Sequence, residues 1–239
     1  MLNVIPVRLV AFLFLAGLCC APPAAAKRNP SRASLEPSAE MLARVKSAVV
    51  LITTYDQRGT PEKQGSGFFL TADRVVTNLH VVNAASQIRI NTFTGKTFTA
   101  DLILAADKNS DLALLQLSAP CSDATALTLA EVEPLEGAPV MLVSNPLGAH
   151  WRVTAGEVGP PWSFFEIGER LQITADVLPG SSGGPVLNLE GRVIGIAVMH
   201  VESNDNLNFA VPVARLKELQ CRLPGGQLAQ DVCSLEFKL

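Results

Sequence analysis

The sequence predicts an all-β protein, either a β-sandwich or a pair of β-barrels, because short apolar runs of strand length recur along the whole chain. The first half contains such runs at residues 48–54, 67–70, 75–82, 88–91, 97–104 and 112–117. The second half contains them at residues 140–144, 152–158, 171–175, 185–188, 192–199 and 208–211. Turn-forming pairs such as Thr94-Gly95 and Glu190-Gly191 separate the runs, which argues against alternating βαβ units.

Helical patterns occur only near the two ends of this region. Ser38 can cap a short helix that continues to Lys46, and helical periodicity returns near residues 214–222. Residues 120–139 contain no strong strand pattern and form the natural linker between the two sets of strands. The predicted division is a lead-in at 27–40, a first set of strands within 41–120, a second within 121–220, and a tail at 221–239.

Composition and charge exclude several classes of protein. Hydrophobic residues make up 48% of the 239 residues and charged residues 17%, which is too apolar for a disordered or coiled-coil chain. The chain has 19 basic and 22 acidic side chains, and its formal net charge is -3. A nucleic-acid binder, or a protein that binds anionic membranes, needs a basic surface that this balance does not supply.

Residues 1–26 have the pattern of an export signal, with Arg8 before an apolar run at 9–21 and small residues up to Ala26. We expect cleavage after Ala26, which leaves 18 basic and 22 acidic side chains and a mature net charge of -4. The apolar run is well short of the ~20 residues that a membrane-spanning helix needs, which disfavours an uncleaved anchor. The protein is therefore predicted to be exported, to the periplasm or out of the cell.

An exported protein can form disulfides. Cleavage removes Cys19 and Cys20, whose preceding residues are too large for a lipid-attachment site, and leaves Cys121, Cys221 and Cys233. Three cysteines predict one disulfide and one free thiol. We favour a bridge between Cys221 and Cys233, because it would hold a tail that is otherwise short of core contacts.

The segment PGSSGGP at residues 179–185 is the strongest local indication of chemistry. Three glycines around two serines allow a tight turn with converging backbone N–H groups, which an oxyanion hole beside a nucleophile requires. A plain turn between strands is the alternative. An α/β-hydrolase elbow is disfavoured, because residues 186–194 read as strand, turn and strand, and because His200 precedes Asp205 in the chain.

A serine nucleophile needs a base within hydrogen-bond reach and an acid that orients the base. His80 lies at the end of an apolar run, and Asp111 begins the run at 112–117. Each alone has an ordinary structural interpretation, as a half-buried histidine and as an aspartate at a strand start. The order histidine, aspartate, then serine segment is the informative observation.

Five segments follow one another along the chain: GSGF at 65–68, TNLHVV at 77–82, DLALL at 111–115, PGSSGGP at 179–185 and NFAVP at 208–212. Together, over about residues 41–219, they resemble the protease domain of HtrA/DegP-type serine endopeptidases, within the trypsin-like class. The resemblance implies two six-stranded antiparallel β-barrels, within 41–120 and 121–220, with the active site in the cleft between them and short helices at both ends.

The resemblance also implies roles for particular residues. Ser182 would be the nucleophile, His80 the general base and then the general acid, and Asp111 the residue that orients the imidazole. The backbone N–H groups of Gly180 and Ser182 would form the oxyanion hole. No metal and no organic cofactor is implied.

The chain departs from related proteins in two places. Only 26 residues follow Val213, so we expect a protease domain without the PDZ domains that usually follow it, and we carry over no PDZ-based regulation. Ser181 occupies the position at which trypsin zymogens have an aspartate that pairs with the freed N-terminus. Activation by N-terminal cleavage is therefore not expected.

The pocket for the side chain before the scissile bond is less well defined by the sequence. The resemblance assigns its walls to Val177, Val198, Met199 and His200, which predicts a preference for small or medium apolar side chains. The alternative is that Asp176, six residues before Ser182, selects arginine or lysine. We expect His150 and His200 to lie in loops or at the pocket rim without a catalytic role.

These observations lead to the hypothesis of an exported serine endopeptidase that acts on unfolded or damaged polypeptides. The alternative is a binding or chaperone-like module that has the protease fold and little or no proteolytic activity. Neither nucleic acid nor stable membrane insertion is expected, and the sequence does not predict an oligomeric state.

Overall fold

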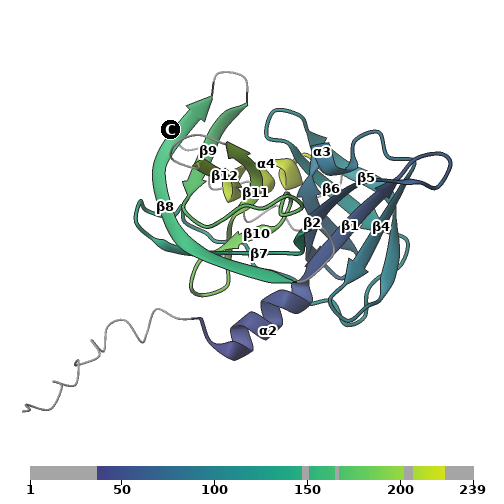
Figure 1. Ribbon diagram of the computed structural model, residues 1–239, viewed down its shortest axis with the longest axis horizontal. Coiled ribbons are helices and arrows are strands. Elements are labelled where there is room, and N and C mark those ends of the chain that lie inside the picture. The colour runs from purple at the N-terminus through teal and green to yellow at the C-terminus, as the bar shows by residue number, and fades with distance from the viewer. Residues whose placement is uncertain (1–36, 147–150, 165–166, 202–206, 224–239) are drawn as a thin grey trace, which may run out of the picture. The chain divides into compact units, whose positions relative to one another are not determined.

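The computed structural model describes residues 37–146, 151–164, 167–201 and 207–223, and these ranges contain two closed antiparallel β-barrels (Figure 1). The first, in the order β1-β2-β3-β6-β5-β4, consists of β1 (Val49–Tyr55), β2 (Pro61–Thr71), β3 (Arg74–Asn78), β4 (Gln87–Thr92), β5 (Thr97–Asp107) and β6 (Leu112–Leu117). The second, in the order β10-β11-β12-β9-β8-β7, consists of β7 (Pro139–Ser144), β8 (Arg152–Phe164), β9 (Gly168–Ile173), β10 (Pro185–Leu187), β11 (Val193–Val201) and β12 (Leu207–Pro212). The predicted pair of six-stranded barrels is confirmed.

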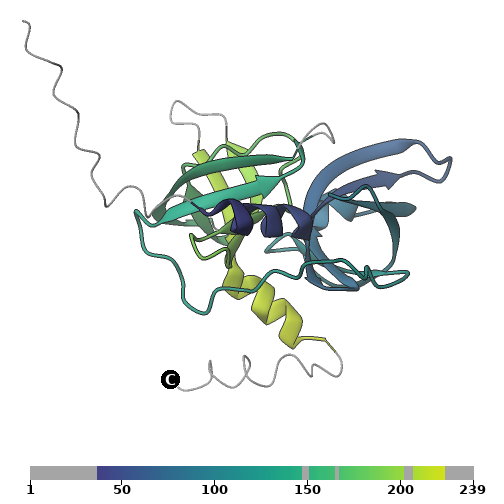
Figure 2. The same ribbon diagram turned by 90° about the horizontal axis from the view of Figure 1, so that it is seen from below.

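Two helices flank the barrels, as the sequence predicts. Before β1 lies α2 (Ala39–Ala48), and the Ser38 hydroxyl caps it by accepting a hydrogen bond from the Met41 backbone N–H at 3.1 Å. After β12 lies α4 (Val213–Cys221), which begins as the strand ends (Figure 2). None of the helices in the described part of the chain is long and apolar enough to span a membrane.

One predicted strand is wrong in its second half. The run at 75–82 leaves the sheet at Asn78 and continues as a single helical turn, α3 (Leu79–Val82). The Leu79 backbone N–H donates to the Asp111 carbonyl oxygen at 3.0 Å, and the Asn83 N–H donates to the Leu79 carbonyl at 2.7 Å. The β-branched residues in this turn are buried all the same, so the apolar pattern predicts burial correctly and the backbone conformation incorrectly.

Each barrel has its own core. In the first barrel the core includes Val50, Ile52, Phe69, Val75 and Leu115, all with no exposed surface. In the second it includes Val140, Leu142, Ile173, Val186 and Ala210.

A third core joins the two barrels. It contains residues that alternate along the strands with those of the barrel interiors, such as Val49 beside Val50 and Met141 beside Leu142. Strands buried on both faces need apolar residues at consecutive positions. This explains why the sequence shows continuous apolar runs rather than an alternating pattern.

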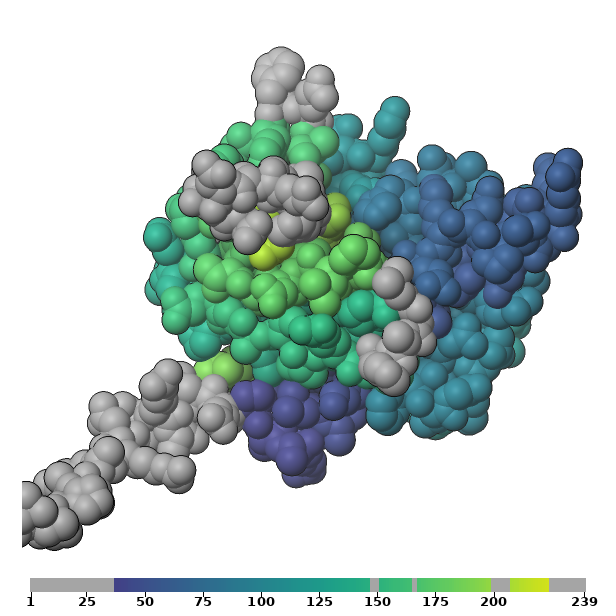
Figure 3. Space-filling view, viewed as in Figure 1, coloured from purple at the N-terminus to yellow at the C-terminus, as the bar shows by residue number. Residues whose placement is uncertain are grey.

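Both helices contribute to this shared core. Val45 and Ala48 of α2 and Leu216 and Leu219 of α4 are almost completely buried in it. In the space-filling view, α2 lies against both barrels (Figure 3). The helices therefore cover apolar surface that the barrels leave open.

Several predictions concern residues outside the described ranges. These are the export signal at 1–26, most of the lead-in at 27–40, His150, Cys233 and most of the tail at 221–239. Cys121 is a buried free thiol, and the bridge between Cys221 and Cys233 stays a prediction.

Two glycines of β8 differ in what lies beside them, and this difference gives a test of barrel packing. A Cβ at Gly156 would overlap the Ala175 backbone nitrogen, whereas a Cβ at Gly159 would lie 2.8 Å from the Gln172 side chain, which can move. We expect Gly156→Ala to lower the free energy of unfolding by about 2–3 kcal/mol, because backbone cannot give way easily. Gly159→Ala is the matched control and should cost less than about 1 kcal/mol, as measured by urea denaturation. Equal effects would contradict this packing.

Candidate functional site

The loop that carries Ser182 is a tight turn stabilised by its own backbone. The Ser181 N–H donates to the Leu178 carbonyl at 2.8 Å, and the Gly184 N–H donates to the Ser181 carbonyl at 2.9 Å. Gly183 has a φ of 87°, and a Cβ at this position would overlap the Ser66 carbonyl oxygen and the Thr77 hydroxyl. Only glycine combines a positive φ with the absence of a Cβ, which explains why a glycine follows Ser182.

The Ser66 side chain connects this loop to the rest of the site. Its hydroxyl has no exposed surface, donates to the Gly180 carbonyl at 2.8 Å and accepts the Asn145 N–H at 2.9 Å. The Ser66 backbone N–H donates to the Ser182 carbonyl at 2.8 Å. One residue of β2 therefore binds the serine loop and the end of β7, across the boundary between the barrels.

His80 and Asp111 form a close pair. The His80 Nδ1 atom lies 2.5 Å from Asp111 Oδ2, and the His80 backbone N–H donates to Asp111 Oδ1 at 2.8 Å. The His80 side chain is 49% exposed and that of Asp111 is 22% exposed. The acid is thus largely covered, while the imidazole is open to an incoming molecule.

The backbone at Asp111 is in the left-handed region, with a φ of 60°. Aspartate tolerates this region better than most residues, and the conformation persists where surrounding contacts hold it. Here the Asp111 carbonyl accepts the Leu79 N–H and the Asn78 side-chain amide, both at 3.0 Å. The aspartate therefore holds the start of the helical turn with its backbone and the histidine with its carboxylate.

The serine loop packs against the segment that carries the histidine. A Cβ at Gly183 would lie 3.2 Å from the Asn78 nitrogen, two residues before His80. Gly65 lies between Val81, the residue after His80, and the Ser182 carbonyl. Contacts from both barrels thus bring the three sequence-predicted residues to one place.

The Ser182 hydroxyl has a weak contact of its own and does not pair with the His80 imidazole among the described residues. It donates to the Val198 carbonyl at 3.5 Å, which is a long hydrogen bond, and no hydrogen bond between it and His80 is present among the described residues.

The turn leaves two backbone N–H groups for a ligand. Those of Ser181, Gly183 and Gly184 donate to carbonyl groups of the protein. Those of Gly180 and Ser182 have no acceptor in the part of the chain that the structure describes. Two such donors on one turn are able to stabilise a negatively charged oxygen.

Ser181 is held by neutral contacts. Its side chain is almost fully buried, lies 3.0 Å from the Ser144 hydroxyl and accepts the Leu178 N–H at 3.3 Å. These contacts hold the serine loop without a charged residue at this position.

The predicted pocket residues occupy different environments. Val177 is buried in the core of the second barrel, and Val198 packs against the shared core. Asp176 is exposed, and its carbonyl accepts the Thr154 hydroxyl at 2.9 Å. The side chains of Met199 and His200 are outside what the structure describes, so the pocket stays a prediction.

Sequence reasoning assigned no role to three residues near the site: Ser66, Asn78 and Arg170. Ser66 and Asn78 lie in the segments GSGF and TNLHVV, where only the histidine was singled out. Arg170 gives no sequence signal, because an arginine in a half-apolar strand is ordinarily exposed. It is nevertheless 3% exposed, and burial lowers the pKa of its guanidinium.

A cavity of about 690 Å³ lies between β8, β9, α4 and the linker, and Trp162, Leu171 and Ala214 are part of its lining. His80, Asp111 and Ser182 are not part of that lining. The three sequence-predicted residues therefore lie outside the lining of this cavity. No cluster of metal-ligating side chains occurs within the described ranges.

The chain is similar to known proteins of one family. The family described as trypsin-like peptidase domain matches residues 65–196. A probable periplasmic serine endoprotease DegP-like of Hahella chejuensis is 35% identical over 172 residues, which cover 66% of this chain and 35% of that protein. The periplasmic serine endoprotease DegP of Escherichia coli K12 is 34% identical over 169 residues, which cover 66% and 35%. The crystal structure of the serine endoprotease from Yersinia pestis superposes with a TM-score of 0.66 at 26% identity, over 77% of this chain and 65% of that one.

The match covers only about a third of the length of these curated relatives. The expected resemblance to HtrA/DegP-type proteins is confirmed for the part of the chain that aligns.

The contacts of Ser66 can be tested by removing its hydroxyl. We expect Ser66→Ala to lower the free energy of unfolding by about 2–3 kcal/mol, because it leaves the Gly180 carbonyl and the Asn145 N–H unpaired in a buried place. Ser118→Ala, at an exposed serine of the same barrel, is the control and should change stability by less than about 0.5 kcal/mol. Urea denaturation measures both, and a Ser66→Ala protein as stable as the control would contradict the role of this hydroxyl.

Proposed function

Because the chain belongs to the trypsin-like peptidase family, we propose that it is a serine endopeptidase that cleaves peptide bonds with Ser182, His80 and Asp111. The observation that carries the proposal is the His80–Asp111 pair, at 2.5 Å and 2.8 Å, on a segment that packs against the serine loop. A covered carboxylate and an open imidazole suit a base that must meet a substrate.

The first half of the reaction forms an acyl-enzyme. The Ser182 Oγ atom adds to the carbonyl carbon of the peptide bond while His80 Nε2 accepts the hydroxyl proton. Asp111 keeps the imidazole in the tautomer that has its hydrogen on Nδ1 and stabilises the imidazolium that forms. His80 then donates the proton to the leaving amine, the C–N bond breaks, and the acyl group remains on Ser182 as an ester.

The second half releases the acyl group by hydrolysis. Water adds to the ester carbonyl as His80 accepts its proton, and the same proton returns to Ser182 Oγ when the ester bond breaks. In both halves the carbonyl oxygen becomes negatively charged. The free N–H groups of Gly180 and Ser182 would bind this oxygen, and losing one such donor typically costs about 10²–10³ in rate.

The substrates and the compartment are proposed from the family resemblance and the N-terminal sequence, not from the geometry of the site. We infer that the substrates are unfolded or damaged polypeptides and that the protein acts in the periplasm or outside the cell. The signal-like residues 1–26 support export, and two relatives are named periplasmic endoproteases.

Labelling by a fluorophosphonate probe tests the nucleophile. We expect the wild-type protein to be labelled and to cleave a denatured protein mixture, whereas Ser182→Ala should do neither, because only an activated serine attacks the probe. The measurement is in-gel fluorescence after labelling, together with identification of the peptides released.

Ser118→Ala is the control for this experiment. It removes an exposed hydroxyl of the first barrel that takes no part in the serine loop, and labelling should persist. If the wild type is not labelled, or if Ser182→Ala is labelled equally, the protein is not a serine peptidase, and the binding or chaperone-like module becomes the better hypothesis.

Asp111→Asn tests the acid without disturbing the backbone, since asparagine also tolerates a positive φ. If the asparagine carbonyl keeps the His80 backbone N–H, its amide nitrogen faces Nδ1 and stabilises the wrong tautomer. We expect kcat to fall about 10⁴-fold with the fold intact. Steady-state kinetics with a peptide identified above, and circular dichroism, measure the two effects. A variant with normal kcat would show that Asp111 does not act in catalysis.

A further inference from the structure

Arg170 is a buried cation in the second barrel with an unusual set of partners. It lies in β9, and its side chain donates to backbone carbonyl oxygens only. One terminal nitrogen donates to the Ile167 carbonyl at 2.6 Å and to the Glu169 carbonyl at 2.9 Å. Its Nε atom is buried without a hydrogen-bond partner, and no carboxylate pairs with it directly among the described residues. Such a group is costly to bury, so its location needs a reason beyond packing.

The second terminal nitrogen of Arg170 crosses to the first barrel. It donates to the Asn109 carbonyl oxygen at 3.0 Å. Asn109 lies in the short loop between β5 and β6, two residues before Asp111. A side chain of one barrel therefore holds the backbone of the loop that carries the acid of the other barrel.

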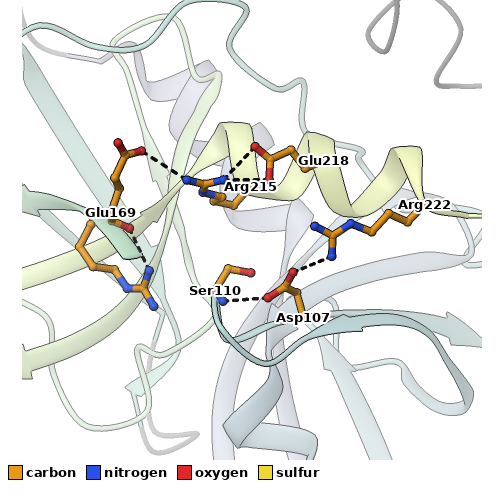
Figure 4. A network of polar contacts seen from close by, with 7 residues as sticks. Asp107, Ser110, Glu169, Arg215, Glu218 and Arg222 are labelled. Atoms are coloured by element: carbon orange, nitrogen blue, oxygen red, sulfur yellow. Dashed lines mark hydrogen bonds and ion pairs between the residues drawn. The ribbon is translucent and has the colours of Figure 1, made fainter. Parts of the chain in front are cut away.

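That loop is organised around Asp107. The Asp107 Oδ1 atom accepts the backbone N–H groups of Asn109 and Ser110, both at 2.9 Å. Arg222, the residue after α4, donates to Asp107 Oδ2 at 2.7 Å, as Figure 4 shows. The Arg222 side chain is 60% exposed, and a salt bridge so open to water contributes little. Of the hydrogen bonds from Arg170 and Arg222, the buried one from Arg170 is the stronger.

The nearby carboxylates favour a positively charged Arg170 beside the loop between β5 and β6. Burial lowers the pKa of the Arg170 guanidinium, and the carboxylates of Asp111 and Asp107 oppose that effect. The positive charge of Arg215 on α4 also lowers the pKa of Arg170. Arg215 itself forms ion pairs with Glu218 and Glu169 (Figure 4).

We propose that Arg170 is a positioning residue for the acid of the triad: by holding the Asn109 carbonyl, it keeps Asp111 in its left-handed backbone conformation with the carboxylate on His80. The inference rests on the proposed function and adds a residue of the second barrel to the machinery of the first. A backbone conformation of this kind persists only where neighbours hold it, and Arg170 is the neighbour that the second barrel supplies.

The experiment compares Arg170→Met, which keeps the apolar stem, with Arg170→Lys, which keeps the charge. We expect Arg170→Met to lower kcat on the order of 10²-fold with KM within about twofold, because a small misplacement of a catalytic group has this effect. The proton between His80 Nδ1 and Asp111 should give a far-downfield signal in the proton NMR spectrum, and this signal should shift or disappear. Arg170→Lys should recover most of the loss in kcat.

Arg192→Met is the matched control, because Arg192 is an exposed arginine of the same barrel whose side chain forms a loose ion pair with Glu131, at 3.8 Å. It should leave kcat and the downfield signal unchanged. A folded Arg170→Met protein with the wild-type signal and kcat would overturn the proposal. If Arg170→Met does not fold, Arg170→Gln takes its place under the same criteria.

The NMR signal separates this inference from the proposed function. If the wild-type protein shows no peptidase activity and no labelling, the proposed function fails, but the signal still reports whether Arg170 positions Asp111. If the wild type is active and the downfield signal is unchanged in Arg170→Met, only the positioning role fails.

Discussion

The buried Ser66 hydroxyl is the interaction on which the geometry of the site depends. It bonds to the serine loop through the Gly180 carbonyl and to the end of β7 through the Asn145 N–H. Its own backbone bonds to Ser182. One side chain therefore fixes the loop of the second barrel against a strand of the first. Because the hydroxyl is buried, its loss would leave the Gly180 carbonyl and the Asn145 N–H without their partner away from bulk water, which is costly.

The shared core makes such a contact possible. Strands such as β1 and β7 bury one face inside their barrel and the other between the barrels, so neither barrel is a finished unit alone. Close packing leaves little freedom for the barrels to slide against each other. Hydrogen bonds between them can then hold specific atoms in place, from Ser66 to Gly180 and from Arg170 to Asn109.

Much of the fold and the candidate site could be predicted from residue patterns. Apolar runs and turn pairs located the strands of both barrels, and PGSSGGP located the serine loop. The order of His80 and Asp111 before that loop indicated their pairing. The pattern failed at residues 79–82, where buried β-branched residues form a helical turn instead of a strand. At the start of this turn the Leu79 N–H donates to the carbonyl oxygen of Asp111, which lies far along the chain, so no local pattern could reveal this contact.

The sequence by itself determined which residues can form strands and which side chains can transfer protons, because these properties depend on a residue and its near neighbours. Only the tertiary structure decided which of those groups meet. Ser66 and Gly180 are 114 residues apart in sequence, and Arg170 and Asn109 are 61 apart. Such pairs form only when both barrels have closed and packed together, and a buried arginine looks like an exposed one until that packing is known.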